Sequence, residues 1–197
     1  MTTGERLRLF VAIAPPAAVR SALGAAIDEL RQIVQGPMRR VPLASIHLTL
    51  KFLGDVDLSR VDELAESLGD ACAGVPPFEL RLAGGGTFPA GKRPSAVWTG
   101  LGGEIDQLHE LQHAVESAMV ELGFGAESRP FGPHLTLARI GGRLAPDRMR
   151  ALGDGLASLR YPDDASFVVD QVGLIRSQLG HGAPCYTTLA EAVLVSG

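Results

Sequence analysis

The sequence has few cysteines, few aromatic residues and no long apolar run. Its 197 residues include two cysteines, one tryptophan and two tyrosines. Cys72 and Cys185 stand far apart and match no metal-binding or redox spacing, so there is no disulfide framework to read. A reducing cytoplasm is then the simplest compartment. The apolar stretch 7–13 is too short and too interrupted for a signal peptide or a membrane span, so we expect no membrane partner.

An excess of positive charge is also missing. Lys and Arg number 18 against 22 Asp and Glu, which gives a net charge of −4 at pH 7. Proteins that coat long nucleic acids are strongly basic, so this class is disfavoured, although a local basic cluster could still meet the end of an RNA. Hydrophobic residues make up 46% of the chain, which is enough for a substantial core in one large domain or two small lobes.

The tetrapeptide His-Leu-Thr-Leu is present twice, beginning at His47 and at His134. In each copy apolar and polar residues alternate, and a glycine follows, which is typical of a half-buried strand. Residues two apart on a strand point to the same face, so His47 lies beside Thr49, and His134 beside Thr136. The leucines form the opposite face. Each copy therefore predicts a strand with an apolar back and a titratable front.

Other periodicities place further helices and strands along the chain. The predicted helices begin near Ala17, after a cap at Asp57 or Ser59, near Glu104, and at Pro146. The predicted strands cover 7–14, 46–53, 78–82, 96–99, the second His-Leu-Thr-Leu copy, 166–175 and 186–195, with a glycine-rich loop at 84–94.

The second half of the chain repeats the order of the first. His134 lies 87 residues after His47, and the same shift matches the helices and strands around them. Two copies are too few for a solenoid. We therefore predict one domain over 1–197, made of two lobes related by a pseudo-twofold, with repeats at about 16–99 and 103–186. Equivalent strands can then meet across a central cleft and bring both motifs together.

Two histidines and two threonines in one cleft suit a displacement at phosphorus. Histidine titrates near neutrality, so one ring can accept a proton while the other donates one. Threonine hydroxyls can donate hydrogen bonds to the nonbridging oxygens, where negative charge is held. A cyclic phosphodiester needs no metal under this scheme. A lone histidine on a strand is usually only packed or exposed, but two at matching places in a repeat favour a catalytic pair.

The paired motifs resemble those of the two-histidine phosphoesterase superfamily, and particularly the LigT-like RNA 2′,3′-cyclic phosphodiesterases, older members of which were described as 2′-5′ RNA ligases. The resemblance is carried by residues 8–13, 47–54, 86–89, 133–139 and 177–179, with Trp98, Gly182 and Tyr186.

This resemblance implies an α+β fold of two lobes, with antiparallel sheets around a central cleft and helices on the outside. It implies hydrolysis of RNA 2′,3′-cyclic phosphate ends to 2′-phosphate ends, without metal or cofactor. We expect a monomer that binds RNA ends or small cyclic nucleotides. It assigns His47 as the proton donor and His134 as the proton acceptor, an order that the residues alone do not give. Thr49, Thr136 and Arg139 are the expected substrate-binding residues.

The cations and aromatic residues near the motifs are harder to place. Strand parity puts Arg139 on the face opposite His134 unless the strand twists or bulges. Lys51 has the parity of a site residue and competes with Arg139 for a phosphate contact. Phe88 and Tyr186 could stack on a base or ribose, although burial in the core is the commoner fate of an aromatic residue.

Two other sequence patterns resemble the motifs of known sites. Residues 109–113 read His-Glu-x-x-His on a predicted helix, as in zinc peptidases, but no third ligand follows at the expected distance. Residues 86–92 resemble the start of a P-loop, but Arg93 stands where Ser or Thr should bind Mg²⁺.

The functional alternatives that stay open are another 2′-phosphodiester substrate, reversible 2′-5′ RNA ligation, a zinc peptidase, and an RNA-end binder without catalysis.

Overall fold

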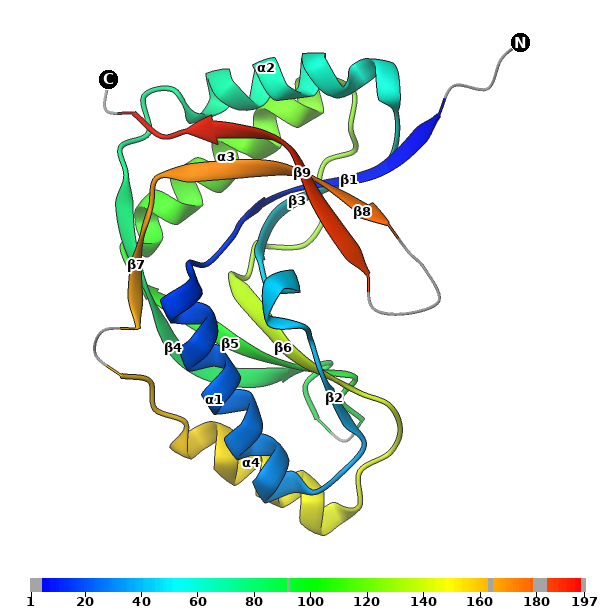
Figure 1. The fold of residues 1–197 in the computed structure, drawn as a ribbon, viewed down its shortest axis with the longest axis vertical. Helices are drawn as coiled ribbons and strands as arrows, with labels where there is room; N and C mark the ends of the chain where they lie inside the picture. Colours follow the sequence, from blue (N-terminus) through cyan, green and yellow to red (C-terminus); the bar gives the residue numbers. More distant parts are fainter. Residues whose placement is uncertain (1–4, 92, 163–164, 179–183, 196–197) are drawn as a thin grey trace.

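A computed structural model describes residues 5–91, 93–162, 165–178 and 184–195, which form two antiparallel sheets flanked by helices (Figure 1). The first sheet has the strand order β3 (Leu48–Asp57), β1 (Arg6–Ile13), β8 (Gln171–Gln178), β9 (Cys185–Val193). The second sheet has the order β2 (Met38–Arg40), β6 (His134–Ile140), β5 (Ala96–Gly103), β4 (Phe78–Phe88), β7 (Ser166–Val169). The helices are α1 (Ala17–Val34), α2 (Val61–Cys72), α3 (Ile105–Glu121) and α4 (Pro146–Ser158). The predicted α+β class with antiparallel sheets is confirmed.

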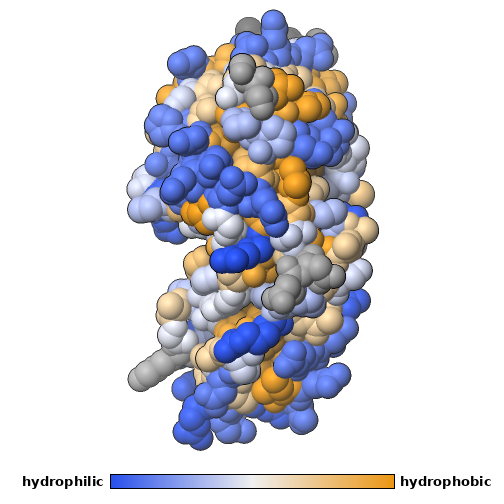
Figure 2. Space-filling view, turned by 90° about the vertical axis from the view of Figure 1, so that its left-hand side faces the viewer, coloured by the Kyte–Doolittle hydropathy of each residue, from blue (hydrophilic) through white to orange (hydrophobic). Residues whose placement is uncertain are grey.

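Each sheet is covered by one pair of helices. Helices α2 and α3 pack together against the first sheet, and α1 and α4 pack together against the second (Figure 1). Seen from the side, the molecule is indented between the upper part, which holds the first sheet, and the lower part, which holds the second (Figure 2). None of the helices in the described ranges is long and apolar enough to cross a membrane.

The chain crosses between the sheets several times. Strand β1 lies in the first sheet, whereas the helix that follows it, α1, covers the second. Strand β6 lies in the second sheet, whereas the helix before it, α3, covers the first. Each half of the sequence therefore contributes to both lobes. The repeat limits 16–99 and 103–186, and the single domain over 1–197, stay predictions.

The first helix shows why the local predictions succeed. Val19, Leu23 and Ile27 recur at helical spacing and are buried. The helix ends at Gln35, which adopts left-handed backbone angles and donates its N–H to the carbonyl of Arg31. All four helices lie where the sequence predicts them.

The strands differ from the prediction at β2, which the sequence analysis does not predict, and in two further places. Residues 84–88 were expected in a loop, but β4 continues through them, with an irregularity between Ala83 and Gly86, and pairs with β5. A Cβ at Gly86 would overlap the ring of Trp98, so glycine is needed where this ring crosses β4. The expected strand 166–175 is divided at Asp170 into β7 and β8, which belong to different sheets.

Candidate active site

The two repeated motifs lie on β3, the edge strand of the first sheet, and on β6, which lies between β2 and β5 in the second sheet. Their four leucines, two from each copy, are buried in one hydrophobic cluster. His47 directly precedes β3, and His134 is the first residue of β6. These histidines and the paired Thr49 and Thr136 are half-buried. The apolar back and polar front that the alternation predicts are both present.

The two histidine rings lie near enough to interact electrostatically. Burial lowers the pKa of His47 to about 4, a backbone hydrogen bond with Ser45 opposes this shift, and the positive charge of His134 adds to it. Because the pKa is lowered, His47 is neutral at pH 7 in the free protein. The structure thus brings together, from two different sheets, the pair that the sequence singles out.

A backbone carbonyl fixes the orientation of the His134 ring. Its Nδ1 lies 2.8 Å from the carbonyl oxygen of Gly132. A carbonyl can only accept a hydrogen bond, so the neutral ring carries its hydrogen on Nδ1 and leaves the lone pair of Nε2 free. His47 makes its backbone hydrogen bond to Ser45, which also stands two residues before its histidine.

Aromatic rings of the first sheet surround His47. The ring centroid of Phe10, on β1, lies 4.6 Å from that of His47, and Tyr186, on β9, meets the same ring edge-on at 5.0 Å. These contacts explain the burial that lowers the pKa of His47. Sequence reasoning includes Phe10 in the stretch 8–13 that carries the resemblance but does not place it at the site, although it is one residue out of phase with the buried Leu9 and Val11 of β1.

Aromatic rings of the second sheet surround His134 in the same way. Phe88 meets the ring edge-on at 4.8 Å, and the ring of Trp98 lies at 6.3 Å and stacks on Phe88. Phe88 is 42% exposed, and Tyr186 is half-buried. Both face the site and neither is an ordinary core residue.

A bulge decides the direction of Arg139. Trp98 of β5 pairs with Thr136, but the next pair is Val97 with Ala138, so β6 carries one extra residue between them. The side-chain alternation therefore reverses, and the exposed Arg139 shares the face of Thr136 rather than the opposite face. Burial raises the pKa of Tyr186, and the charges of Arg139 and Arg8 partly oppose that rise. The charge of Arg139, in the second sheet, therefore acts on an aromatic residue of the first sheet.

The matching bulge in β3 turns Lys51 away from the site. Ala12 of β1 pairs with Thr49 and Val11 pairs with Lys51, which leaves one extra residue between the two pairs. The Lys51 side chain is buried, and its Nζ lies 2.8 Å from Glu116 Oε1. The expectation that Lys51 competes for a phosphate contact is wrong, because its charge is already paired on the helix-covered side of the sheet.

The structure does not support the zinc-peptidase-like pattern at 109–113 or the P-loop-like pattern at 86–92. His109 and His113 are exposed on α3, and the ring of His109 packs edge-on against Phe131. Across the described ranges, no three His, Cys, Asp or Glu side chains lie close enough together to hold a metal ion, so the zinc pattern lacks a third ligand. In the P-loop-like stretch, residues 86–88 belong to β4, and Lys92 lies outside the described residues, as do Leu179 and Gly182.

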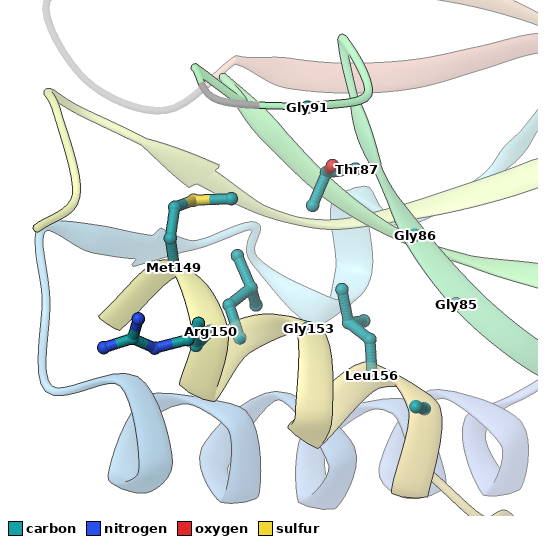
Figure 3. A pocket seen from close by; sticks show the side chains of 10 residues that line it. Gly85, Gly86, Thr87, Gly91, Met149, Arg150, Gly153 and Leu156 are labelled. Atoms are coloured by element: carbon teal, nitrogen blue, oxygen red, sulfur yellow. The ribbon is translucent and has the colours of Figure 1, made fainter. Parts of the chain in front are cut away.

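A separate cavity of about 570 Å³ lies on the other side of β4, between that strand and α4 (Figure 3). Thr87 lines it together with Met149 and Leu156, and its walls are mainly apolar. The next residue, Phe88, lies against His134 instead. The cavity contains neither histidine of the repeated motifs and is distinct from the candidate active site.

The chain matches a known protein family over most of its length. The model of the 2′-5′ RNA ligase superfamily matches residues 15–181. The chain belongs to this superfamily. Among superfamily members, a protein of Aeropyrum pernix named RNA 2′,3′-cyclic phosphodiesterase is 34% identical over 163 residues, covering 81% of this chain and 88% of that protein. A protein of the same name from Methanothermobacter thermautotrophicus is 29% identical over 184 residues, covering 93% and 97%.

Solved structures of other proteins share the fold. TT0787 of Thermus thermophilus superposes with a TM-score of 0.75 at 29% identity, covering 95% of this chain and 98% of that one. E. coli LigT without ligand superposes with a TM-score of 0.74 at 26% identity, covering 97% and 99%. The family resemblance and the fold class predicted from the paired motifs are both confirmed.

Proposed function

We propose that the chain hydrolyses the 2′,3′-cyclic phosphate at RNA ends to a 2′-phosphate, acting as a cytoplasmic monomer. The observation that carries this proposal is the pair of half-buried, electrostatically coupled histidines, one from each sheet. Relatives named RNA 2′,3′-cyclic phosphodiesterase from several species support the same substrate.

In the proposed reaction a water molecule attacks phosphorus while the bond from phosphorus to the 3′ oxygen breaks. His134 accepts a proton from the water, for which its free Nε2 lone pair is suited. His47 donates a proton to the departing 3′ oxygen. The product then carries a 2′-phosphate and a free 3′ hydroxyl, and the two histidines have exchanged protonation states.

As the proton donor, His47 must carry a proton when the substrate is bound. In the free protein its pKa is about 4, mainly because the ring is buried. A bound phosphodiester anion next to the ring favours the charged imidazolium and raises this pKa. We propose that His47 gains its proton together with the substrate. A donor of low pKa is also a strong acid, which helps it to protonate the leaving oxygen.

Thr49 and Thr136 complete the proposed site. Each follows its histidine by two residues on the same side of the strand, so their hydroxyls are suited to donate hydrogen bonds to the nonbridging oxygens. Arg139, exposed on the face of Thr136, is suited to attract the phosphate or a neighbouring nucleotide. The scheme uses no metal and no cofactor.

Conversion of an RNA with a 2′,3′-cyclic phosphate end should proceed in excess EDTA, because both proton transfers use side chains of the chain itself. The product, identified by ³¹P NMR, should be the 2′-phosphate. The variant His109→Ala, which changes an exposed histidine of the zinc-like pattern, should convert the RNA at the wild-type rate. Failure to convert, or conversion only after zinc is added, would contradict the proposal.

A second candidate substrate is a small nucleotide. E. coli LigT has been crystallised in complex with 3′-AMP, at 28% identity to this chain. Comparing kcat/KM for a cyclic mononucleotide and for an RNA oligonucleotide with the same end separates the two substrates. Reversible 2′-5′ ligation would appear as joined RNA in the same assays, and an RNA-end binder would bind the oligonucleotide without turnover.

A further inference from the structure

A buried ion pair connects the strand of the first motif to the chain segment that leads to the second. Lys51, on β3, donates from Nζ to Glu116 Oε1 at 2.8 Å and to the carbonyl oxygen of Gly125 at 2.9 Å. The side chains of Lys51 and Glu116 are 3% and 19% exposed. Glu116 lies on α3, which packs against the first sheet.

The same pair holds the connection between α3 and β6. Residues 122–133 form neither helix nor strand, so hydrogen bonds to neighbouring elements must fix their path. Lys51 binds the carbonyl of Gly125, and Glu116 Oε1 also accepts the backbone N–H of Glu127 at 2.9 Å. The far end of this segment supplies the Gly132 carbonyl that orients His134.

Stability alone does not explain this arrangement. Removing two charges from water is costly, and an apolar pair of similar size is often as stable as a buried ion pair or more so. Glu116 Oε2 is itself buried and has no hydrogen-bond partner among the described residues. Burial raises the pKa of Glu116, but the hydrogen bonds from Lys51 and Glu127, together with the charges of Lys51 and His113, lower it by more, so the carboxylate is charged at pH 7. The pair is therefore better suited to fixing a geometry than to maximising stability.

We propose that Lys51 is a positioning residue that sets the spacing of His47 and His134 by tying β3 to the segment that carries the second motif. Lys51 follows His47 by four residues on one chain segment, and the backbone groups that it and Glu116 hold lead directly to Gly132. The role rests on the proposed function for its effect on turnover, but it also predicts a property of the protein without substrate.

The test uses a variant that removes the ion pair without leaving an unpaired charge. Lys51→Met alone leaves the buried Glu116 carboxylate without its cationic partner and is expected to lower Tm by roughly 10 °C. In the double variant Lys51→Met with Glu116→Leu, Tm should return most of the way to the wild-type value. The kcat of this variant should still fall about 100-fold with little change in KM, because the histidines are no longer held at the productive distance. The control Asp28→Asn, which breaks an exposed ion pair with Arg40, should keep the wild-type kcat.

An NMR titration of the His47 ring supplies a readout that needs no substrate. The pKa of His47 should rise in the double variant, because the positive charge of His134 lowers this pKa from the other sheet and acts less strongly when the two rings are no longer held close together. A double variant with wild-type kcat and an unchanged His47 pKa would overturn the proposal, whatever its Tm. If the wild-type protein does not act on the RNA at all, the titration alone decides whether Lys51 positions the histidines.

Discussion

Replacing His134 by alanine is expected to lower kcat for the RNA cyclic phosphate roughly 100- to 10,000-fold, and replacing His47 by alanine to lower it by a similar factor. Each change removes one of the two proton transfers. The two losses should not multiply in the double variant, because the groups act in one step. Initial rates at saturating RNA, measured in EDTA, give kcat directly.

Exposed histidines provide the control for this comparison. His113→Ala changes a ring on the surface of α3 and should leave kcat within about twofold of wild type, because the substitution touches neither the hydrogen bonds nor the burial of the proposed site. If His47→Ala or His134→Ala were as active as this control, the altered histidine would have no part in proton transfer.

The second large effect is expected from the threonines. Thr49→Val and Thr136→Val should each lower kcat about 100- to 1000-fold, the usual loss when one hydrogen-bond donor to a developing negative charge is removed. Valine keeps the branched shape that suits a strand, so the fold should persist. Thr49→Ser and Thr136→Ser keep the hydroxyl and should recover most of the rate.

A threonine outside the site separates this effect from a general change in the sheet. Thr187 is exposed on β9, and Thr187→Val should not alter kcat. Losses below about threefold at both Thr49 and Thr136 would exclude hydrogen bonding to the phosphate oxygens as a major contribution.

The front and back of the two motif strands could be predicted from the sequence because side-chain alternation is a local property. The same holds for the helices, since the buried faces of α1 and α3 follow from apolar spacing alone. The resemblance to a known family depended on these local patterns, which is why family and fold class were both correct.

The bulges could not be predicted, and they reverse the side-chain alternation at Lys51 and Arg139. The extra residue in β3 is defined by pairing with β1, and that in β6 by pairing with β5. Each depends on a partner strand far away in the sequence. The expectation that Lys51 competes for a phosphate contact is therefore wrong, whereas Arg139 lies on the face of Thr136 and not on the opposite face that strand parity predicts.

Long-range contacts also explain the other differences. The glycines of β4 were expected in a loop because the ring of Trp98, which requires Gly86 beneath it, comes from another strand. Phe10 was not placed at the site because its contact with His47 depends on the neighbouring strands of the first sheet. Nothing in the local sequence shows that the chain crosses between the sheets.

The pH dependence of kcat/KM in the two histidine variants tests the central claim most directly. Wild type should give a bell-shaped profile, because the reaction needs a protonated donor, His47, and an unprotonated acceptor, His134. In His47→Ala the residual rate should rise with pH to a plateau, because only the acceptor remains. In His134→Ala it should fall as pH rises through the pKa of His47, because only the donor remains. Two variants that both keep the full bell would contradict a site built from these two histidines.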